Sequence, residues 1–239
     1  MSKGNLSVEA QARYAYIERS LTAEVPVGAT VVELGAAPGD QIARFADLGY
    51  DSVALDIDID SDNWGDGDVG RMRKLFVDHG VTYVPWNMED LPYPIADASA
   101  DAVIMTEVFE HLRDYPINSL REARRILKPT GRLYFTTPNQ AYLMNRLRLL
   151  AGKNVATPLD DWISGQVFAR HAREYTFDEV KRLMALADLD IVSLTSRHFH
   201  LDSGKQGVVA RATKSGISKL AEWRPSLGPQ IIVVATPRV

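Results

Sequence analysis

The chain contains the stretch Val31-Val-Glu-Leu-Gly-Ala-Ala-Pro-Gly-Asp40, in which a short apolar run ends at a glycine turn. A helical pattern follows over residues 40–48 and stops at Gly49. Gly35 and Gly39 allow a tight turn and let a ligand lie close to the main chain. The stretch therefore predicts a strand, a ligand-binding turn and a helix in succession.

Apolar strand-like runs alternate with amphipathic helical segments along the rest of the chain. Strands are expected at residues 52–57, 81–84, 102–106, 132–137, 191–195 and 231–235, and helices at 117–127, 142–150 and 176–187. This alternation predicts an α/β fold, in which right-handed crossovers build a parallel sheet with helices on both faces. In such a sheet, ligands bind beyond the carboxyl ends of the strands.

Residues 1–239 are expected to form a single domain, because no internal repeat or low-complexity segment interrupts the alternation. Two stretches, about 139–175 and 202–230, are long for connections and are expected to be functional insertions. A capped helix at about residues 7–21 carries Tyr14 and Tyr16. It is expected either to cover the ligand or to pack on the core.

The composition is that of an ordinary globular protein and excludes several classes of function. The 27 basic residues are outnumbered by 31 acidic ones, which argues against binding nucleic acid through phosphate neutralisation. The chain has no cysteine, so disulfides, thiolate metal sites and cysteine nucleophiles are excluded. The first residues lack the apolar core of a signal peptide, and no apolar run approaches the length of a membrane span. A cytoplasmic location is therefore expected.

Two acids near the glycine turn indicate which ligand it binds. Asp56 ends the next predicted strand, about 20 residues after the turn, where a carboxylate can bind two ribose hydroxyls. A dinucleotide-binding turn has glycine where this chain has Ala37, and Glu33 would repel a diphosphate but attract a cation. These features favour a positively charged nucleoside, such as S-adenosylmethionine, over a nicotinamide dinucleotide. A nicotinamide-dependent oxidoreductase is the alternative, and tight NADH binding would support it.

Further motifs lie in a fixed order along the chain. They are the turn at residues 33–39, Asp56, the segments 86–92, 100–112 and 126–131, and a stretch at 171–189. Together they resemble the class I S-adenosylmethionine-dependent methyltransferases, in particular the branch of small-molecule and ubiquinone-biosynthesis-type enzymes. The resemblance implies a Rossmann-like, doubly wound, mostly parallel seven-stranded sheet with an antiparallel last strand. It also puts the two insertions on the side of the methyl acceptor.

The resemblance implies that S-adenosylmethionine binds at the turn and leaves as S-adenosylhomocysteine. The residues that it assigns to cofactor binding are Glu33, Gly35, Ala37, Gly39, Asp56, Ile57, Asn87, Met88 and Glu107. Asn87 replaces the family's acid that receives the adenine amino group, and its amide oxygen can accept the same hydrogen bond.

The reaction implied is an in-line methyl transfer, in which a base removing the acceptor's proton contributes about 10²–10⁴-fold. Glu110, His111 and His171 are the candidate catalytic residues. His111 follows the fourth strand, where the methyl group should point, but it could instead pack the following helix. His171 lies in a stretch similar to one in natural-product and glycan-tailoring members. It could instead fix its own loop through Arg173 and Glu174.

The predicted function is O-methylation of a hydroxyl on a small molecule, with a sugar or saccharide as the first candidate. The alternatives are a C-methyltransferase of the quinone-biosynthesis type and a catalytically inactive cofactor-binding protein. No nucleic-acid or membrane partner is expected, because the chain has no basic surplus and no basic amphipathic helix. The insertions are compatible with a homodimer.

No metal ligands are expected. The run of aspartates from Asp56 to Asp68 fails the calcium-loop pattern, since starting from Asp60 the fifth position is Trp64 and the twelfth is Arg71. A solvated acidic loop is the simpler interpretation. Some sugar-modifying members of the family use magnesium, so the effect of a chelator on activity is worth measuring.

Overall fold

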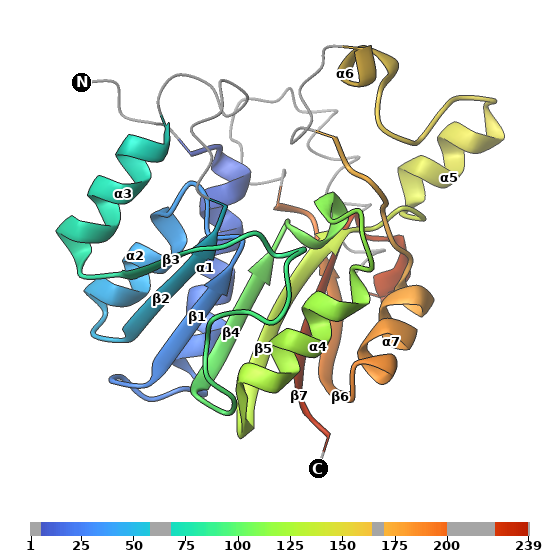
Figure 1. Cartoon of the computed structure of the whole chain (residues 1–239). Coiled ribbons are helices and arrows are strands. Elements are labelled where there is room, and N and C mark those ends of the chain that lie inside the picture. Colours follow the sequence, from blue (N-terminus) through green and yellow to red (C-terminus); the bar gives the residue numbers. More distant parts are fainter. Residues whose placement is uncertain (1–5, 58–67, 164–169, 200–222, 239) are drawn as a thin grey trace.

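The structure is a computed structural model that describes residues 6–57, 68–163, 170–199 and 223–238 (Figure 1). One seven-stranded sheet runs in the order β3-β2-β1-β4-β5-β7-β6. Its strands are β1 (Thr30–Leu34), β2 (Asp51–Asp56), β3 (Thr82–Pro85), β4 (Ala100–Thr106), β5 (Leu127–Pro138), β6 (Leu189–Arg197) and β7 (Gln230–Pro237). β7 runs antiparallel to both of its neighbours, β5 and β6, and all the other pairings in the sheet are parallel. The predicted α/β fold with an antiparallel last strand is therefore confirmed.

Helices cover both faces of the sheet (Figure 1). They are α1 (Val8–Thr22), α2 (Asp40–Asp47), α3 (Asp68–His79), α4 (Ile117–Ile126), α5 (Leu143–Leu150), α6 (Leu159–Ile163) and α7 (Phe177–Leu186), with short 3₁₀ turns η2 (Phe109–His111) and η5 (Pro225–Leu227). On one face, α4 and α7 pack against the sheet in one apolar cluster. On the other face, α1, α2 and α3 form a second cluster. The two clusters hold the strands in place, so the site can be built on their ends.

Local signals explain several element boundaries. Thr176 and Glu179 form the expected capping box, in which each side chain accepts a hydrogen bond from the other residue's main chain. The fifth strand begins at Leu127, five residues before the predicted start, because Leu127 pairs with Ala100. A register irregularity between Ala100 and Ala102 accommodates the breaker residues that follow Leu127.

Two helices were not predicted from the sequence. In α3, Met72 and Phe76 are the residues buried among its described side chains, so its apolar pattern is too sparse to recognise. The short α6 lies within the insertion at 139–175 and exposes Leu159 and Ile163. Most of the insertion predicted at 202–230 lies outside the described residues. Within the described part of the chain, no helix has the length and apolar character needed to cross a bilayer.

Candidate functional site

A cavity of about 540 Å³ lies beyond the carboxyl ends of β1, β2 and β4 and is called the turn cavity here. Eight residues that the resemblance assigns to cofactor binding line it: Glu33, Gly35, Ala37, Asp56, Ile57, Asn87, Met88 and Glu107. Gly39 does not line the turn cavity. It caps α2 at a φ of 96°, and a Cβ there would lie 2.8 Å from Phe76 Cε1.

Gly35 brings the main chain of the turn against the segment that follows β4. Its φ is +73°, and an added Cβ would lie 2.3 Å from Val108 Cγ2. Only glycine meets both conditions without strain.

Gly35→Ala is expected to lower the free energy of unfolding by about 2–5 kcal/mol, combining left-handed backbone strain with overpacking against Val108. Gly28→Ala is the matched control, because Gly28 has a φ of +86° but nothing within 4 Å of the added Cβ. It should cost only the backbone strain, about 1–2 kcal/mol. Urea denaturation of both variants, and of Gly35→Ala/Val108→Ala, measures the difference. Equal losses for the two glycine variants would contradict the close approach.

Asp56 holds the turn in place from the end of β2. Its two carboxylate oxygens accept hydrogen bonds from the main-chain N–H groups of Ala37 at 2.6 Å and Ile57 at 2.7 Å. Burial raises the pKa of Asp56 to about 6, although both backbone hydrogen bonds oppose the shift. The carboxylate keeps lone pairs for a ligand, because each oxygen can accept more than one bond.

Glu33 is a buried carboxyl group in the wall of the turn cavity, with 3% of its surface exposed. Its Oε2 has no hydrogen-bond partner in the described part of the chain. Burial, followed by the charge of Asp56, raises the pKa of Glu33 well above its usual range. A positively charged ligand group is the partner that would compensate this carboxyl group.

Arg13 of α1 also lines the turn cavity, and the sequence analysis missed it. Its guanidinium lies 3.9 Å from Glu107 Oε2, and its Nε is buried without a hydrogen-bond partner among the described residues. The sequence carried a signal, because Arg13, Ile17 and Leu21 lie four residues apart on one helix face. A cation in an otherwise apolar stripe indicates a role in a site. Tyr14 lines the same cavity, so α1 both covers it and packs on the core.

A second, larger cavity of about 910 Å³ lies over the ends of β5, β6 and β7 and is called the insertion cavity here. Segments from the insertion at 139–175 supply much of its wall. Its polar lining includes Asn139, Asn145, Arg148, Asn154, Thr157, His171, Glu174, Arg197 and Gln230. The two cavities therefore lie over opposite halves of the same sheet edge.

Glu107 lies where the turn cavity and the insertion cavity meet, since it lines both. It has a φ of 55°, a conformation that non-glycine residues rarely adopt and that recurs at functional sites. Thr136 Oγ1 donates a hydrogen bond to its carboxylate at 2.9 Å, and the Gln230 side chain donates another. Burial raises its pKa, while Arg13 opposes that shift.

The three predicted catalytic residues come together beside this junction. His111 lines the turn cavity and His171 lines the insertion cavity, and their rings meet edge-to-face with centroids 4.9 Å apart. Glu110 lines neither cavity and is buried behind the histidines, where Thr137 Oγ1 donates to its Oε2 at 3.1 Å. The main-chain N–H groups of Ala172 and Arg173 donate to the Glu110 carbonyl. These bonds fix the His171 segment onto η2.

The partners of the two histidines define their tautomers. His111 Nδ1 lies 3.2 Å from the Arg170 carbonyl oxygen, and His171 Nδ1 lies 2.9 Å from Glu174 Oε1. Because each partner is an acceptor, each Nδ1 carries a proton, and whenever a ring is neutral its lone pair lies on Nε2. Burial, and then the neighbouring His171, lowers the pKa of His111 to about 4. His111 is therefore neutral at physiological pH.

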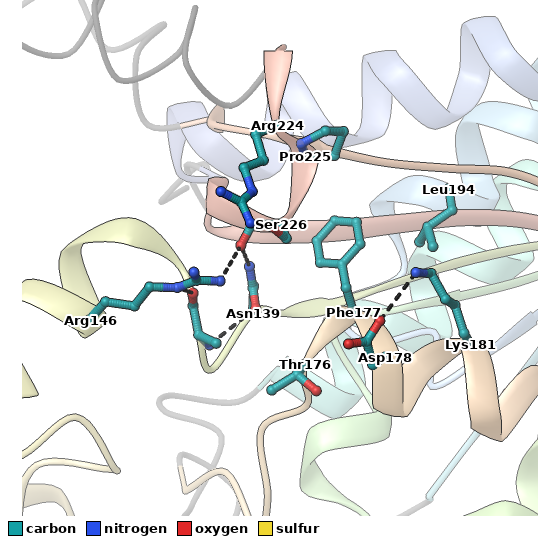
Figure 2. Close-up of a pocket in the computed structure, with 11 residues that line it drawn as sticks. Asn139, Arg146, Thr176, Phe177, Asp178, Lys181, Leu194, Arg224, Pro225 and Ser226 are labelled. Atoms are coloured by element: carbon teal, nitrogen blue, oxygen red, sulfur yellow. Dashed lines mark hydrogen bonds and ion pairs between the residues drawn. The ribbon is translucent and has the colours of Figure 1, made fainter.

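A third cavity, of about 610 Å³, lies beside α7 and η5 (Figure 2). Several of its polar side chains bind one another or nearby main chain: Lys181 donates to Asp178 Oδ1 at 3.1 Å, and Arg146 donates to the Ser226 carbonyl at 3.3 Å (Figure 2). None of the predicted catalytic residues lines this cavity. It is therefore a weaker candidate for a reaction centre than the junction.

Two other predictions concern Asn87 and the run of aspartates after β2. Asn87 lines the turn cavity, and its Oδ1 already accepts a hydrogen bond from the Glu89 N–H at 3.0 Å, which leaves one lone pair for a ligand. The central part of the aspartate run, residues 58–67, lies outside the described residues.

Comparisons with known proteins show which family the chain is similar to. A family model described as a methyltransferase domain matches residues 9–194. A Mycobacterium tuberculosis relative, named a probable S-adenosylmethionine-dependent methyltransferase, is 30% identical over 212 residues, which cover 86% of this chain and 67% of the relative. The demethylmenaquinone methyltransferase of Renibacterium salmoninarum is 29% identical over 142 residues, 55% of each chain.

A solved structure extends the similarity to the fold. It is the 1,6-didemethyltoxoflavin-N1-methyltransferase of Burkholderia thailandensis, with 1,6-didemethyltoxoflavin and S-adenosylhomocysteine bound. The TM-score is 0.59 at 16% sequence identity, and the match covers 98% of this chain and 79% of the other.

Proposed function

The chain belongs to the class I S-adenosylmethionine-dependent methyltransferases, and from that premise we propose that it methylates a hydroxyl oxygen of a small polar molecule. A sugar or saccharide is the first candidate for the acceptor. The observation that carries the proposal is the junction at Glu107. There, the turn cavity with the orphaned carboxyl oxygen of Glu33 meets the polar insertion cavity, with two imidazoles between them.

In our proposal, the turn cavity holds S-adenosylmethionine, which is the methyl donor. The sheet order aligns Asn87 beyond β3, Asp56 on β2 and Glu33 on β1. In our proposal, Asn87 and Met88 hold the adenine, Asp56 holds the ribose hydroxyls, and the orphaned carboxylate of Glu33 compensates positive charge on the donor. Arg13 would hold its carboxylate group. When bound, this donor supplies an electrophilic methyl group on a sulfonium sulfur.

The acceptor would lie in the insertion cavity. Asparagine, arginine, threonine and glutamine side chains there can hydrogen-bond several hydroxyl groups of one molecule. In their neutral forms, the imidazoles of His111 and His171 carry a lone pair on Nε2 and can accept a proton from the reacting hydroxyl. Glu174 orients His171 and would stabilise its protonated form, as a carboxylate does beside a catalytic histidine.

Incubation with methyl-labelled donor and a panel of hydroxylated metabolites, including free and nucleotide-linked sugars, tests the proposal. We expect a product that carries one additional methyl group as a methoxy carbon in its NMR spectrum. If the protein binds the donor and no panel member is methylated, the O-methylation proposal fails, and an inactive cofactor-binding protein becomes the better hypothesis.

A second candidate is carbon methylation of a quinone precursor, which the similarity to demethylmenaquinone methyltransferase supports. The polar lining of the insertion cavity favours the hydroxylated acceptor over an apolar one. A C-methyl product from a demethylated quinone, with no methoxy product from the panel, would reverse this order.

Affinity for S-adenosylhomocysteine is expected to fall as the pH drops below about 6, where unbound Asp56 becomes protonated. Ribose hydroxyls donate to the ionised carboxylate, so below this pKa binding must release a proton and weakens by up to about tenfold per pH unit. Titration calorimetry from pH 8 to pH 5 measures the effect. Asp56→Asn should remove this component of the pH dependence. A wild-type profile that matches the variant's would contradict the role of Asp56.

A further inference from the structure

The cluster of Glu110, His111 and His171 has the donor set of a metal site. One potential ligand atom from each residue lies within 4.8 Å of the other two. The residues come from η2 and from the segment before α7, which the main-chain bonds to the Glu110 carbonyl tie together. The donors are therefore held in place by the fold before any ion arrives.

The hydrogen bonds around the histidines are those of metal ligands. A metal-binding histidine usually donates its other ring N–H to a carboxylate or a main-chain carbonyl, which fixes its tautomer and orientation. His171 has the first arrangement through Glu174, and His111 has the second through the Arg170 carbonyl. In the neutral form of each ring, Nε2 is therefore the nitrogen whose lone pair can bind a cation.

The buried carboxylate of Glu110 is a second feature that points to a cation. Only 1% of its surface is exposed, and Thr137 binds its Oε2 while its Oε1 has no hydrogen-bond partner among the described residues. A buried carboxylate oxygen without a partner is costly unless it binds a charge. Glu107 and Glu174 add negative charge nearby, and Arg13 balances Glu107. A cation beside the imidazoles would satisfy the free oxygen.

We propose that Glu110, His111 and His171 bind one divalent transition-metal cation at the junction of the two cavities. Two nitrogen donors and one carboxylate favour Mn²⁺, Fe²⁺ or Zn²⁺ over Mg²⁺ or Ca²⁺, which prefer oxygen ligands. The three protein ligands leave coordination positions open for an acceptor oxygen. A coordinated hydroxyl is more acidic than a free one, so the cation would assist the loss of its proton to solvent water as the oxygen takes the methyl group from the donor's sulfur.

The role given to the cation in activating a hydroxyl rests on the proposed function, whereas metal binding itself can be measured without any methyl acceptor. In the proposed function, the imidazoles themselves accept the proton of the acceptor. Here their lone pairs hold the cation, and the cation activates the hydroxyl.

The test is titration of the metal-free full-length chain with Mn²⁺, followed by electron paramagnetic resonance, and with Zn²⁺, followed by calorimetry. We expect one site per chain and at least about tenfold weaker binding for His171→Ala and Glu110→Gln. His79→Ala is the control, because His79 pairs with Asp47 on the surface far from the junction and should leave the affinity unchanged. Mg²⁺ should not compete at equal concentration.

S-adenosylhomocysteine binding, measured on the same metal-free samples, separates the two proposals and confirms that each variant is folded. Single-site metal binding that depends on His171 and Glu110 supports the site even if no methylated product is found. Absence of a site in the wild type, or equal affinity in His171→Ala and the wild type, overturns it. In that case O-methylation with an imidazole base would still stand if the donor binds.

Discussion

Replacing both His111 and His171 with alanine is expected to lower the rate of methyl transfer by about 10²–10⁴-fold. The cause is the same whether the imidazoles accept the proton or hold a cation, because both roles need the lone pairs at the junction. Residues that act as one unit are strongly non-additive, so each single variant should lose nearly as much as the pair. The measurement is single-turnover transfer of a labelled methyl group to the acceptor that the panel identifies.

The affinity for S-adenosylhomocysteine is the internal control for these variants. His171 lies outside the turn cavity, so His171→Ala should change that affinity by less than about threefold, a difference of under 1 kcal/mol. His79→Ala should leave the rate unchanged. A loss below about tenfold at both His111 and His171 would remove proton transfer and metal activation from the account.

Replacing Arg13 with alanine is expected to weaken S-adenosylmethionine binding. Each lost hydrogen bond between the guanidinium and the donor's carboxylate should cost about 10- to 150-fold in affinity, and a guanidinium can make two such bonds. The reason is that Arg13 is the half-buried cation of α1 in the wall of the turn cavity, with an Nε that no described residue binds. Titration calorimetry with the donor and with a decarboxylated analogue measures the effect. The analogue should bind the wild type and Arg13→Ala about equally.

Arg19→Ala is the matched control for Arg13. Arg19 belongs to the same helix but is exposed and lines none of the three cavities. Its replacement should leave donor affinity within about threefold of the wild type. If Arg13→Ala weakens the donor and its decarboxylated analogue equally, Arg13 supports Glu107 and α1 rather than binding the carboxylate.

Much of the fold could be predicted because its signals are local. An apolar run such as residues 102–106 predicts a strand, and a breaker such as Gly49 predicts the end of a helix. Both predicted boundaries lie within a few residues of the observed ones. The turn at 33–39 combines two glycines with Glu33, and Asp56 ends the next strand. Because parallel strands end at one edge, these residues had to meet there.

The remaining features depend on contacts that no local pattern encodes. His111 and His171 lie on segments that only the folded sheet brings together, so the sequence offered two separate bases rather than one cluster. The orphaned Oε1 of Glu110 is visible only once its burial is known. Gly39 was assigned to ligand binding by the resemblance. Its positive φ and the close approach of Phe76 explain instead why a glycine is needed at this position.

In our proposal, the turn cavity binds an adenosyl ligand that has no diphosphate. The most direct test is to titrate the wild-type chain in a calorimeter with S-adenosylhomocysteine and, separately, with NADH. We predict one S-adenosylhomocysteine per chain, about tenfold or more weaker binding in Asp56→Ala, and no heat from NADH at concentrations roughly tenfold higher. Saturable NADH binding that Asp56→Ala weakens, with no heat from S-adenosylhomocysteine, would contradict the account.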